Sequence, residues 1–135
     1  MANFTRFKNI SGDGVTRKGY VADATAAAAA YTVDQCLAGM IVRTHTGAAA
    51  DTFPIASAII AAIDNYEQYD SIDVLVRNLS GGANTITISA NTGLTLSGTM
   101  TIAQNNMKWF RLVGTSAPGA TAAVTVYTMT TTQAV

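Results

Sequence analysis

The second half of the chain alternates between apolar and small polar residues. The segment 85–89 reads T-I-T-I-S, and 107–113 reads M-K-W-F-R-L-V. Successive side chains of a β-strand point to opposite faces, so this alternation predicts strands with one buried face. Glycine-bearing turns separate the segments, which is typical of an all-β fold. Strands are therefore predicted at 72–79, 86–89, 94–96, 100–102, 107–113 and 123–129.

The spacing of these strands predicts an antiparallel β-sandwich or barrel, jelly-roll-like in type. Its core is expected from the inward positions, and threonine is expected to cover much of the outer surface, because its branched Cβ suits a pleated sheet. The predicted core comprises Ile72, Val74, Val76, Ile86, Ile88, Leu94, Leu96, Ile102, Leu112, Val124 and Val126.

The region before these strands predicts one clear short helix. Isoleucines recur at helical spacing over 55–63, after a start marked by Thr52 and Pro54. This helix lacks a polar face, so it should be buried or packed at an interface. A shorter helical turn is expected between Thr32 and Gly39. A strand is expected at 40–44, and a loop at 45–53.

Residues 1–30 lack a sustained period and are predicted to form an extended N-terminal arm, followed by a β-sandwich domain over 31–135. Phe4, Phe7, Ile10 and Tyr20 stand in the arm as isolated apolar residues. Such a segment is expected to order when it lies along a neighbouring molecule. An edge strand is the alternative for the arm as a whole. Within it, the alanine-rich stretch 23–30 fits either one or two helical turns or a linker.

The composition points to association with other proteins. Only 12% of the residues are charged, against about 25% in an average soluble domain. The chain holds 24 alanines and 20 threonines. A surface of this kind is poorly protected against association. Its polar residues are mostly neutral, so much of it is expected to contact other subunits.

The charges divide the chain into three parts. Four cations against Asp13 give +3 over residues 1–20, seven acids against Arg43 give −6 over 21–73, and three cations give +3 over 74–135. This arrangement fits contacts between copies, although a solvated distribution without function fits it equally. The net charge is zero, which argues against nucleic-acid binding. We expect neither a membrane span nor a signal peptide, because no long apolar segment exists.

Few residues suit catalysis. Cys36 and His45 are the only members of their types. The cysteine is predicted to be a buried structural residue, consistent with a reducing compartment, and the histidine to be solvated or to cap a loop. We expect no enzymatic activity, no cofactor and no metal site. Four acids recur at intervals of three but cross from a connector into a strand, so a solvated rim or an ion pair with Arg77 or Arg111 is expected. These acids are Asp64, Glu67, Asp70 and Asp73.

Trp109 and Phe110 are adjacent in a predicted strand, so their rings should lie on opposite faces. One ring is expected in the core and the other at a subunit contact. A carbohydrate-binding role remains open if an aromatic ring faces solvent. The candidates are Trp109, Tyr66, Tyr69 and Tyr127.

The run I-D-V-L-V-R-N-L-S-G-G-A-N-T-I-T-I-S-A-N-T-G-L-T-L-S-G-T-M-T-I at 72–102, followed by M-K-W-F-R-L-V and A-V-T-V-Y-T-M, resembles small structural proteins of tailed bacteriophages. With the preceding loop and helix, the resemblance covers roughly residues 40–130. The chain resembles capsid decoration, or cement, proteins and related virion modules. This resemblance implies a non-catalytic homotrimer that clamps neighbouring major capsid proteins on the outer surface of an icosahedral head, assembled in the host cytoplasm.

Alternatives of the same class are a head-fibre, neck or tail module. A carbohydrate-binding module for host attachment is the alternative outside it. For a decoration protein, the sequence predicts that the arm anchors on the capsid or on a sister subunit through Phe4, Arg6, Phe7 and Lys8. It also places Arg77, Trp109 and Arg111 in or near the trimer contact.

Overall fold

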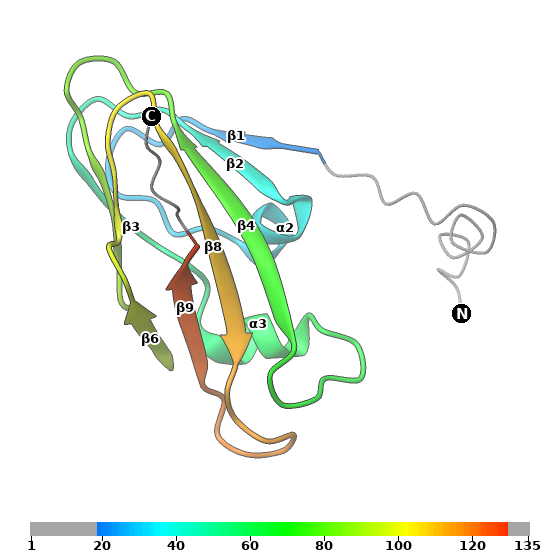
Figure 1. Ribbon diagram of the computed structural model, residues 1–135. Helices are drawn as coiled ribbons and strands as arrows, with labels where there is room; N and C mark the ends of the chain where they lie inside the picture. Colours follow the sequence, from blue (N-terminus) through cyan, green and yellow to red (C-terminus); the bar gives the residue numbers. More distant parts are fainter. Residues whose placement is uncertain (1–18, 130–135) are drawn as a thin grey trace.

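The computed structural model describes residues 19–129, and the predicted arm contacts Phe4, Arg6, Phe7 and Lys8 lie outside this range. Strands dominate the described part of the chain (Figure 1). The elements in chain order are β1 (Val21–Asp23), α2 (Val33–Ala38), β2 (Met40–Arg43), β3 (Ala49–Thr52), α3 (Ala56–Ala61), β4 (Ser71–Asn78), β5 (Ile86–Ser89), β6 (Leu94–Ser97), β7 (Thr101–Ile102), β8 (Met107–Gly114) and β9 (Val124–Thr128).

The strands form two sheets of mixed orientation. The larger sheet has the order β1-β2-β4-β8-β9-β6, and the smaller one has the order β3-β5-β7. The prediction of a β-rich fold is confirmed, but the expectation of a wholly antiparallel arrangement is wrong. The pairs β1–β2, β2–β4, β6–β9 and β3–β5 are parallel. Parallel neighbours need a long crossover, and the chain supplies one between β2 and β4 by passing through β3 and α3.

One local prediction in the first half is wrong, because residues 49–52, expected within a loop, form β3, which pairs with β5. For the stretch 23–30, the linker is observed and not the helical turns. After Asp23, which ends β1, the chain contains no helix before α2 and bridges to β3 through Ala30 and Thr52. Alanine-rich sequence favours helix, but contacts distant in sequence override that preference here. The contacts responsible centre on Arg43 and are described below.

The first of the two short helices, α2, begins and ends as local signals predict. Thr32 caps α2 in a reciprocal capping box with Gln35, and Gly39 ends the helix at φ 98°. The second helix, α3, is shorter than the predicted 55–63 and has no side-chain cap. It buries Ala56 and Ile59 against the core, while Ile55 at its start is exposed. In Figure 1, α3 lies at the end of the larger sheet where β4 begins and β8 ends.

Inward-facing residues from both sheets form one hydrophobic cluster. The predicted core residues all belong to it or pack against it, with Ile72 and Leu96 only partly buried. The sequence pattern missed the aromatic centre of this core. Phe53 packs edge-to-face between Tyr31 and Phe110, with ring centroids 5.6 and 5.3 Å away. Phe53 falls in the predicted loop, where no alternation marks it as buried.

Candidate functional site: the outer face of the six-stranded sheet

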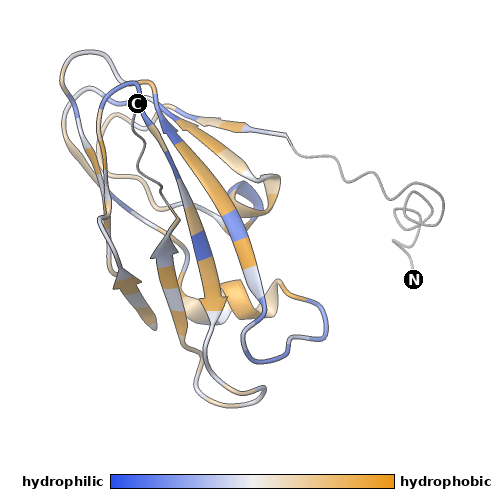
Figure 2. Ribbon diagram, viewed as in Figure 1, coloured by the Kyte–Doolittle hydropathy of each residue, from blue (hydrophilic) through white to orange (hydrophobic). Residues whose placement is uncertain are grey.

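The six-stranded sheet turns one side toward the core and the other toward solvent. Polar and apolar residues accordingly alternate along β4 and β8 (Figure 2). Cross-strand register aligns Asp73 with Arg111 and Leu75 with Trp109. We call the solvent side the outer face. Its central members are Met40, Val42, Asp73, Leu75, Arg77, Met107, Trp109, Arg111, Val113, Thr125 and Tyr127.

Trp109 and Phe110 take opposite sides of the sheet, as predicted. The Phe110 ring is fully buried against Phe53, whereas Trp109 is 45% exposed. The core ring of the pair is therefore Phe110. Whether Trp109 lies at a subunit contact remains a prediction.

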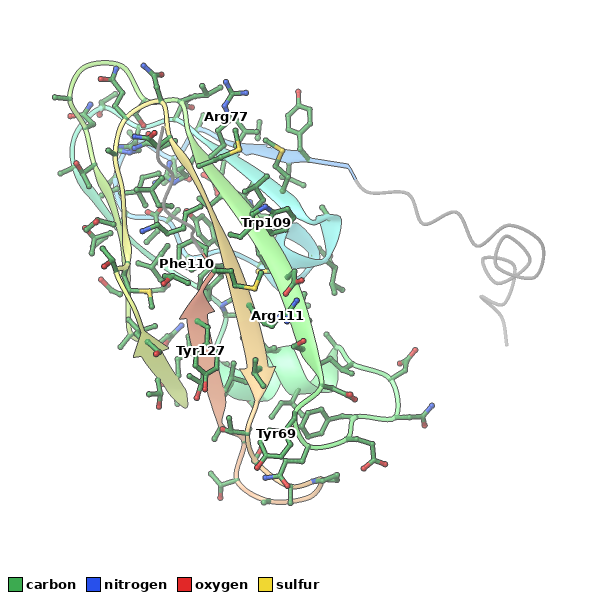
Figure 3. The ribbon with its side chains drawn as sticks, in the orientation of Figure 1. Tyr69, Arg77, Trp109, Phe110, Arg111 and Tyr127 are labelled. Atoms are coloured by element: carbon green, nitrogen blue, oxygen red, sulfur yellow. The ribbon has the colours of Figure 1, made fainter. Side chains whose placement is uncertain are left out.

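The predicted contact residues Arg77, Trp109 and Arg111 share the outer face (Figure 3). Arg111 binds Asp73 on the neighbouring strand through two hydrogen bonds, Nε to Oδ1 at 2.7 Å and Nη2 to Oδ2 at 2.9 Å. The ion pair anticipated for one of the four acids thus forms with Arg111. Hydrogen bonding to Asp73 raises the pKa of the Arg111 guanidinium. The pair presents fixed polar atoms beside the Trp109 ring.

Arg77 has a different environment from Arg111. It lies opposite Met107 on β8 and Val42 on β2, and its side chain is partly buried. Its Nε is shielded from solvent and has no hydrogen-bond partner among residues 19–129. The aliphatic part of an arginine commonly covers apolar surface in this way.

Large apolar side chains stay exposed along the same face. Met107 on β8 is 53% exposed, and Tyr127, which lies opposite Arg111 on β9, is 42% exposed. Exposed apolar residues are common singly, but a group of them on one face indicates an interaction surface. Sequence reasoning missed Met107, although its position two residues before Trp109 places it on the same side of the strand.

A groove of about 740 Å³ opens beside Trp109. It lies next to the first half of β4, and the end of α2 contributes to its wall. Most of its side chains are apolar, and Asp73 is the one charged residue that lines it. The lining residues are Gly19, Leu37, Gly39, Met40, Ser71, Ile72, Asp73, Leu75 and Trp109.

Away from the outer face, a buried ion pair fixes the segment between β1 and α2. Arg43 Nε donates to Asp51 Oδ2 at 2.8 Å, and both side chains are fully shielded from solvent. The remaining guanidinium hydrogens go mainly to backbone carbonyls, including that of Thr25 at 2.6 Å and that of Ala27. Tyr31 donates its hydroxyl to Asp51 Oδ2 at 2.6 Å. Burial opposes the charge of Arg43, but its hydrogen bond with Asp51 outweighs this and raises the guanidinium pKa.

The other candidate reactive residues are scattered. Cys36 is buried as predicted, and burial raises its pKa to about 12. His45 is also buried, at 5% exposure, so of the two alternatives expected for it, solvated or capping a loop, the solvated one is wrong. Its backbone N–H donates to Ser80 Oγ at 3.0 Å, and its ring Nδ1 contacts the carbonyl of Gly47. The hydrogen bond to Ser80 joins the turn after β2 to the turn after β4.

The four spaced acids do not converge either. Asp64 and Glu67 are exposed in the connector after α3, and Asp70 accepts the Glu67 backbone N–H at 2.9 Å. Within residues 19–129, no three or more His, Cys, Asp or Glu side chains gather as a metal site. The two tyrosines of the connector differ in their surroundings. Tyr66 donates to the Ser116 carbonyl at 2.6 Å, whereas Tyr69 is 67% exposed.

Comparisons with protein-family models, with curated proteins and with solved structures give no match. In the described part of the chain, the helices are all too short to span a lipid bilayer.

Proposed function

We propose that this protein is a structural virion protein that decorates an icosahedral phage head. In this proposal it is a jelly-roll-like module that assembles as a trimer and binds neighbouring major capsid proteins on the outer surface of the shell. Its contribution is stabilisation through mass action, since a ligand that binds only the assembled shell stabilises that shell. Three copies of one modest contact reinforce each other through multivalency.

The observation that carries this proposal is the outer face. Trp109, Met107 and Tyr127 leave apolar surface exposed on one side of the sheet, around the Arg111–Asp73 pair. Aromatic residues, methionine and arginine are enriched in protein interfaces, where they act as anchors. The low charge content of the chain and the resemblance of residues 40–130 to decoration proteins support the same function.

The first test is the solution mass, measured by light scattering. A trimer has about three times the monomer mass of 14.0 kDa. The second is co-sedimentation with expanded shells, which should saturate at a fixed number of copies per shell. Replacing Trp109 and Tyr127 together by serine should abolish both trimer formation and shell binding. Tyr69→Ser is the matched control, because Tyr69 is exposed but lies in the connector before β4. A stable monomer that does not co-sediment with shells contradicts the proposal.

The number of copies bound to heads and to tails distinguishes this role from that of a head-fibre, neck or tail module. A decoration protein should bind the head fraction stoichiometrically, whereas a neck or tail component should purify with tails at a low copy number. The same co-sedimentation experiment, carried out on separated heads and tails, distinguishes the two.

The exposed Trp109 ring favours a second candidate, a carbohydrate-binding module. An indole ring with polar groups beside it offers a sugar both a stacking surface and hydrogen-bond partners. The Asp73–Arg111 pair supplies such groups, because Arg111 is two residues from Trp109 on the same face of β8. Calorimetric titration of host-surface glycans into the protein tests this function. Saturable binding that is lost in Trp109→Ser, together with a monomeric mass, would favour it over the decoration role.

A further inference from the structure

The groove beside Trp109 opens where the N-terminal part of the chain joins the described fold. Gly19 lines the groove, and its N–H donates to the Ala38 carbonyl at 3.2 Å. The described part of the chain therefore begins in the lining of this groove, and residues 1–18 precede it in the sequence.

The shape of the groove follows from the sheet register. The pairing of β2 with β4 begins at Met40 and Leu75, so the first half of β4, from Ser71 to Val74, extends beyond the start of β2. Leu37 near the end of α2 and Trp109 on β8 also line the groove. An extended peptide segment can dock beside a strand that lacks a neighbour over part of its length.

The chemistry of the groove matches the sequence of residues 1–18. The walls offer apolar side chains from Leu37, Met40 and Leu75, and Asp73 is the one charged lining residue. Residues 1–18 hold two aromatic residues, Phe4 and Phe7, and four cations against one acid, which gives +3. Residues 19–73 hold seven acids against one cation, which gives −6. The two aromatic residues thus suit the apolar walls of the groove, and the net charge of the segment is opposite to that of residues 19–73.

We propose that Phe4 and Phe7 of a second copy of this chain occupy the groove, with their rings against Trp109 and Leu75. The groove is continuous with the outer face, because both share Leu75 and Trp109, so its occupant belongs to the same assembly contact. Phe4 and Phe7 stand 15 and 12 residues before Gly19, and an extended chain of that length reaches at most about 40–50 Å, which is enough to cross to a neighbouring subunit. This inference rests on the proposed self-association and names the segment that completes it.

Trp109 provides the readout, because it is the only tryptophan of the chain. Indole emission shifts to shorter wavelength when apolar groups replace water around the ring. In the full-length protein, dilution should shift the emission to longer wavelength and lower the mass measured by light scattering. The variant with Phe4→Ser and Phe7→Ser should show the long-wavelength emission at every concentration.

A synthetic peptide of residues 1–18 tests the groove directly. Added to the variant with Phe4→Ser and Phe7→Ser, it should bind saturably and shift Trp109 emission back to shorter wavelength. A peptide carrying the same two serines should not. Leu37→Arg, introduced into the chain with the two serines, should abolish the response to the wild-type peptide. Leu79→Arg is the matched control, because Leu79 is similarly exposed and lies outside the groove lining.

Two results would overturn the inference. One is a wild-type peptide that leaves Trp109 emission unchanged. The other is a full-length protein whose short-wavelength emission depends on Phe4 and Phe7 but not on concentration, which would assign the groove to the chain's own segment. Failure of the proposed function has a different signature. If peptide 1–18 binds as expected but the protein ignores capsid shells, the groove inference stands and the decoration role fails. If the trimer and shell binding persist in the variant with Phe4→Ser and Phe7→Ser, the decoration role stands and the groove inference fails.

Discussion

Arg43 and Asp51 form a buried pair joined by two hydrogen bonds, Nε to Oδ2 at 2.8 Å and Nη2 to Oδ1 at 3.1 Å. The pair links β2 of the larger sheet to β3 of the smaller one. Through the carbonyls of Thr25 and Ala27 it also fixes the segment that follows β1. A single arginine thereby holds three parts of the fold that local sequence preferences leave undetermined.

Replacing Arg43 by methionine should destabilise the protein by about 3–5 kcal/mol, because the Asp51 carboxylate would stay buried without its partner. Asp51→Asn should cost less, since the amide keeps one acceptor oxygen for Arg43 and Tyr31. Urea unfolding followed by circular dichroism measures both. A loss below about 1 kcal/mol for Arg43→Met would show that the pair contributes little. Replacing both residues by apolar ones should recover part of the loss.

Stability should fall in acid through Asp23. Burial opposes its charge, but hydrogen bonds from Thr25 and Gln35 outweigh burial and lower its pKa below the usual value of 3.8. A carboxylate with a lowered pKa contributes stability above its unfolded-state pKa, and this contribution disappears as the pH falls through the folded-state value. Urea midpoints from pH 6 to pH 2 should therefore decline below about pH 4.

Asp23→Asn should flatten that decline. The matched control is Asp34→Asn, which removes an exposed carboxylate from α2. An acid-induced loss that is identical in wild type and Asp23→Asn would show that another carboxylate is responsible.

The Cys36 thiol should react slowly with a disulfide reagent at pH 8. Burial raises its pKa to about 12, so only a trace of thiolate is present, and the side chain is shielded. Denaturant should accelerate the reaction by orders of magnitude. Native-state labelling as fast as that of a free thiol would contradict the buried position on α2.

Two glycines with positive φ allow the stability cost of backbone strain to be measured apart from the cost of steric crowding. Gly93 has φ 78°, and a Cβ added there would lie 2.6 Å from Ala56 Cβ and 2.9 Å from the Ala122 carbonyl oxygen. Gly119 has φ 83° and open space around the same position. Gly119→Ala should cost about 1–2 kcal/mol, the usual strain of a left-handed residue. Gly93→Ala should cost about 1–3 kcal/mol more, because α3 must shift. Thermal unfolding measures both, and equal losses would contradict the crowding argument.

Burial patterns were predictable from the sequence, whereas strand direction was not. Val74, Val76, Leu112 and Val126 are buried as their alternation predicts, because one face of each strand packs on the core. Alternation has the same period in parallel and antiparallel pairs, so it carries no information on the parallel pairing of β2 with β4 or of β6 with β9. Strand β3 was not predicted because Ala49 and Ala50 have low strand preference. The Arg43–Asp51 contact stabilises the strand in spite of that low preference.

The candidate site was predictable to a similar degree. The opposite placement of Trp109 and Phe110 follows from strand geometry, and so does the shared face of Trp109 and Arg111, which are two residues apart. The groove depends on how far β2 extends along β4, which is a matter of register between segments distant in sequence. The Gly19 wall of the groove likewise has no local signature.

The position of β8 in the larger sheet has a consequence for synthesis on the ribosome. It pairs with both β4 and β9, yet it begins at Met107, late in the chain. Until β8 emerges, β4 lacks its antiparallel partner, and Val74 and Val76 lack the Phe110 and Leu112 side chains that lie opposite or next to them across that pair. Nascent chains ending before Met107 should consequently expose apolar surface, aggregate readily and depend on chaperones. The six-stranded sheet should form completely only when the final fifth of the sequence leaves the exit tunnel.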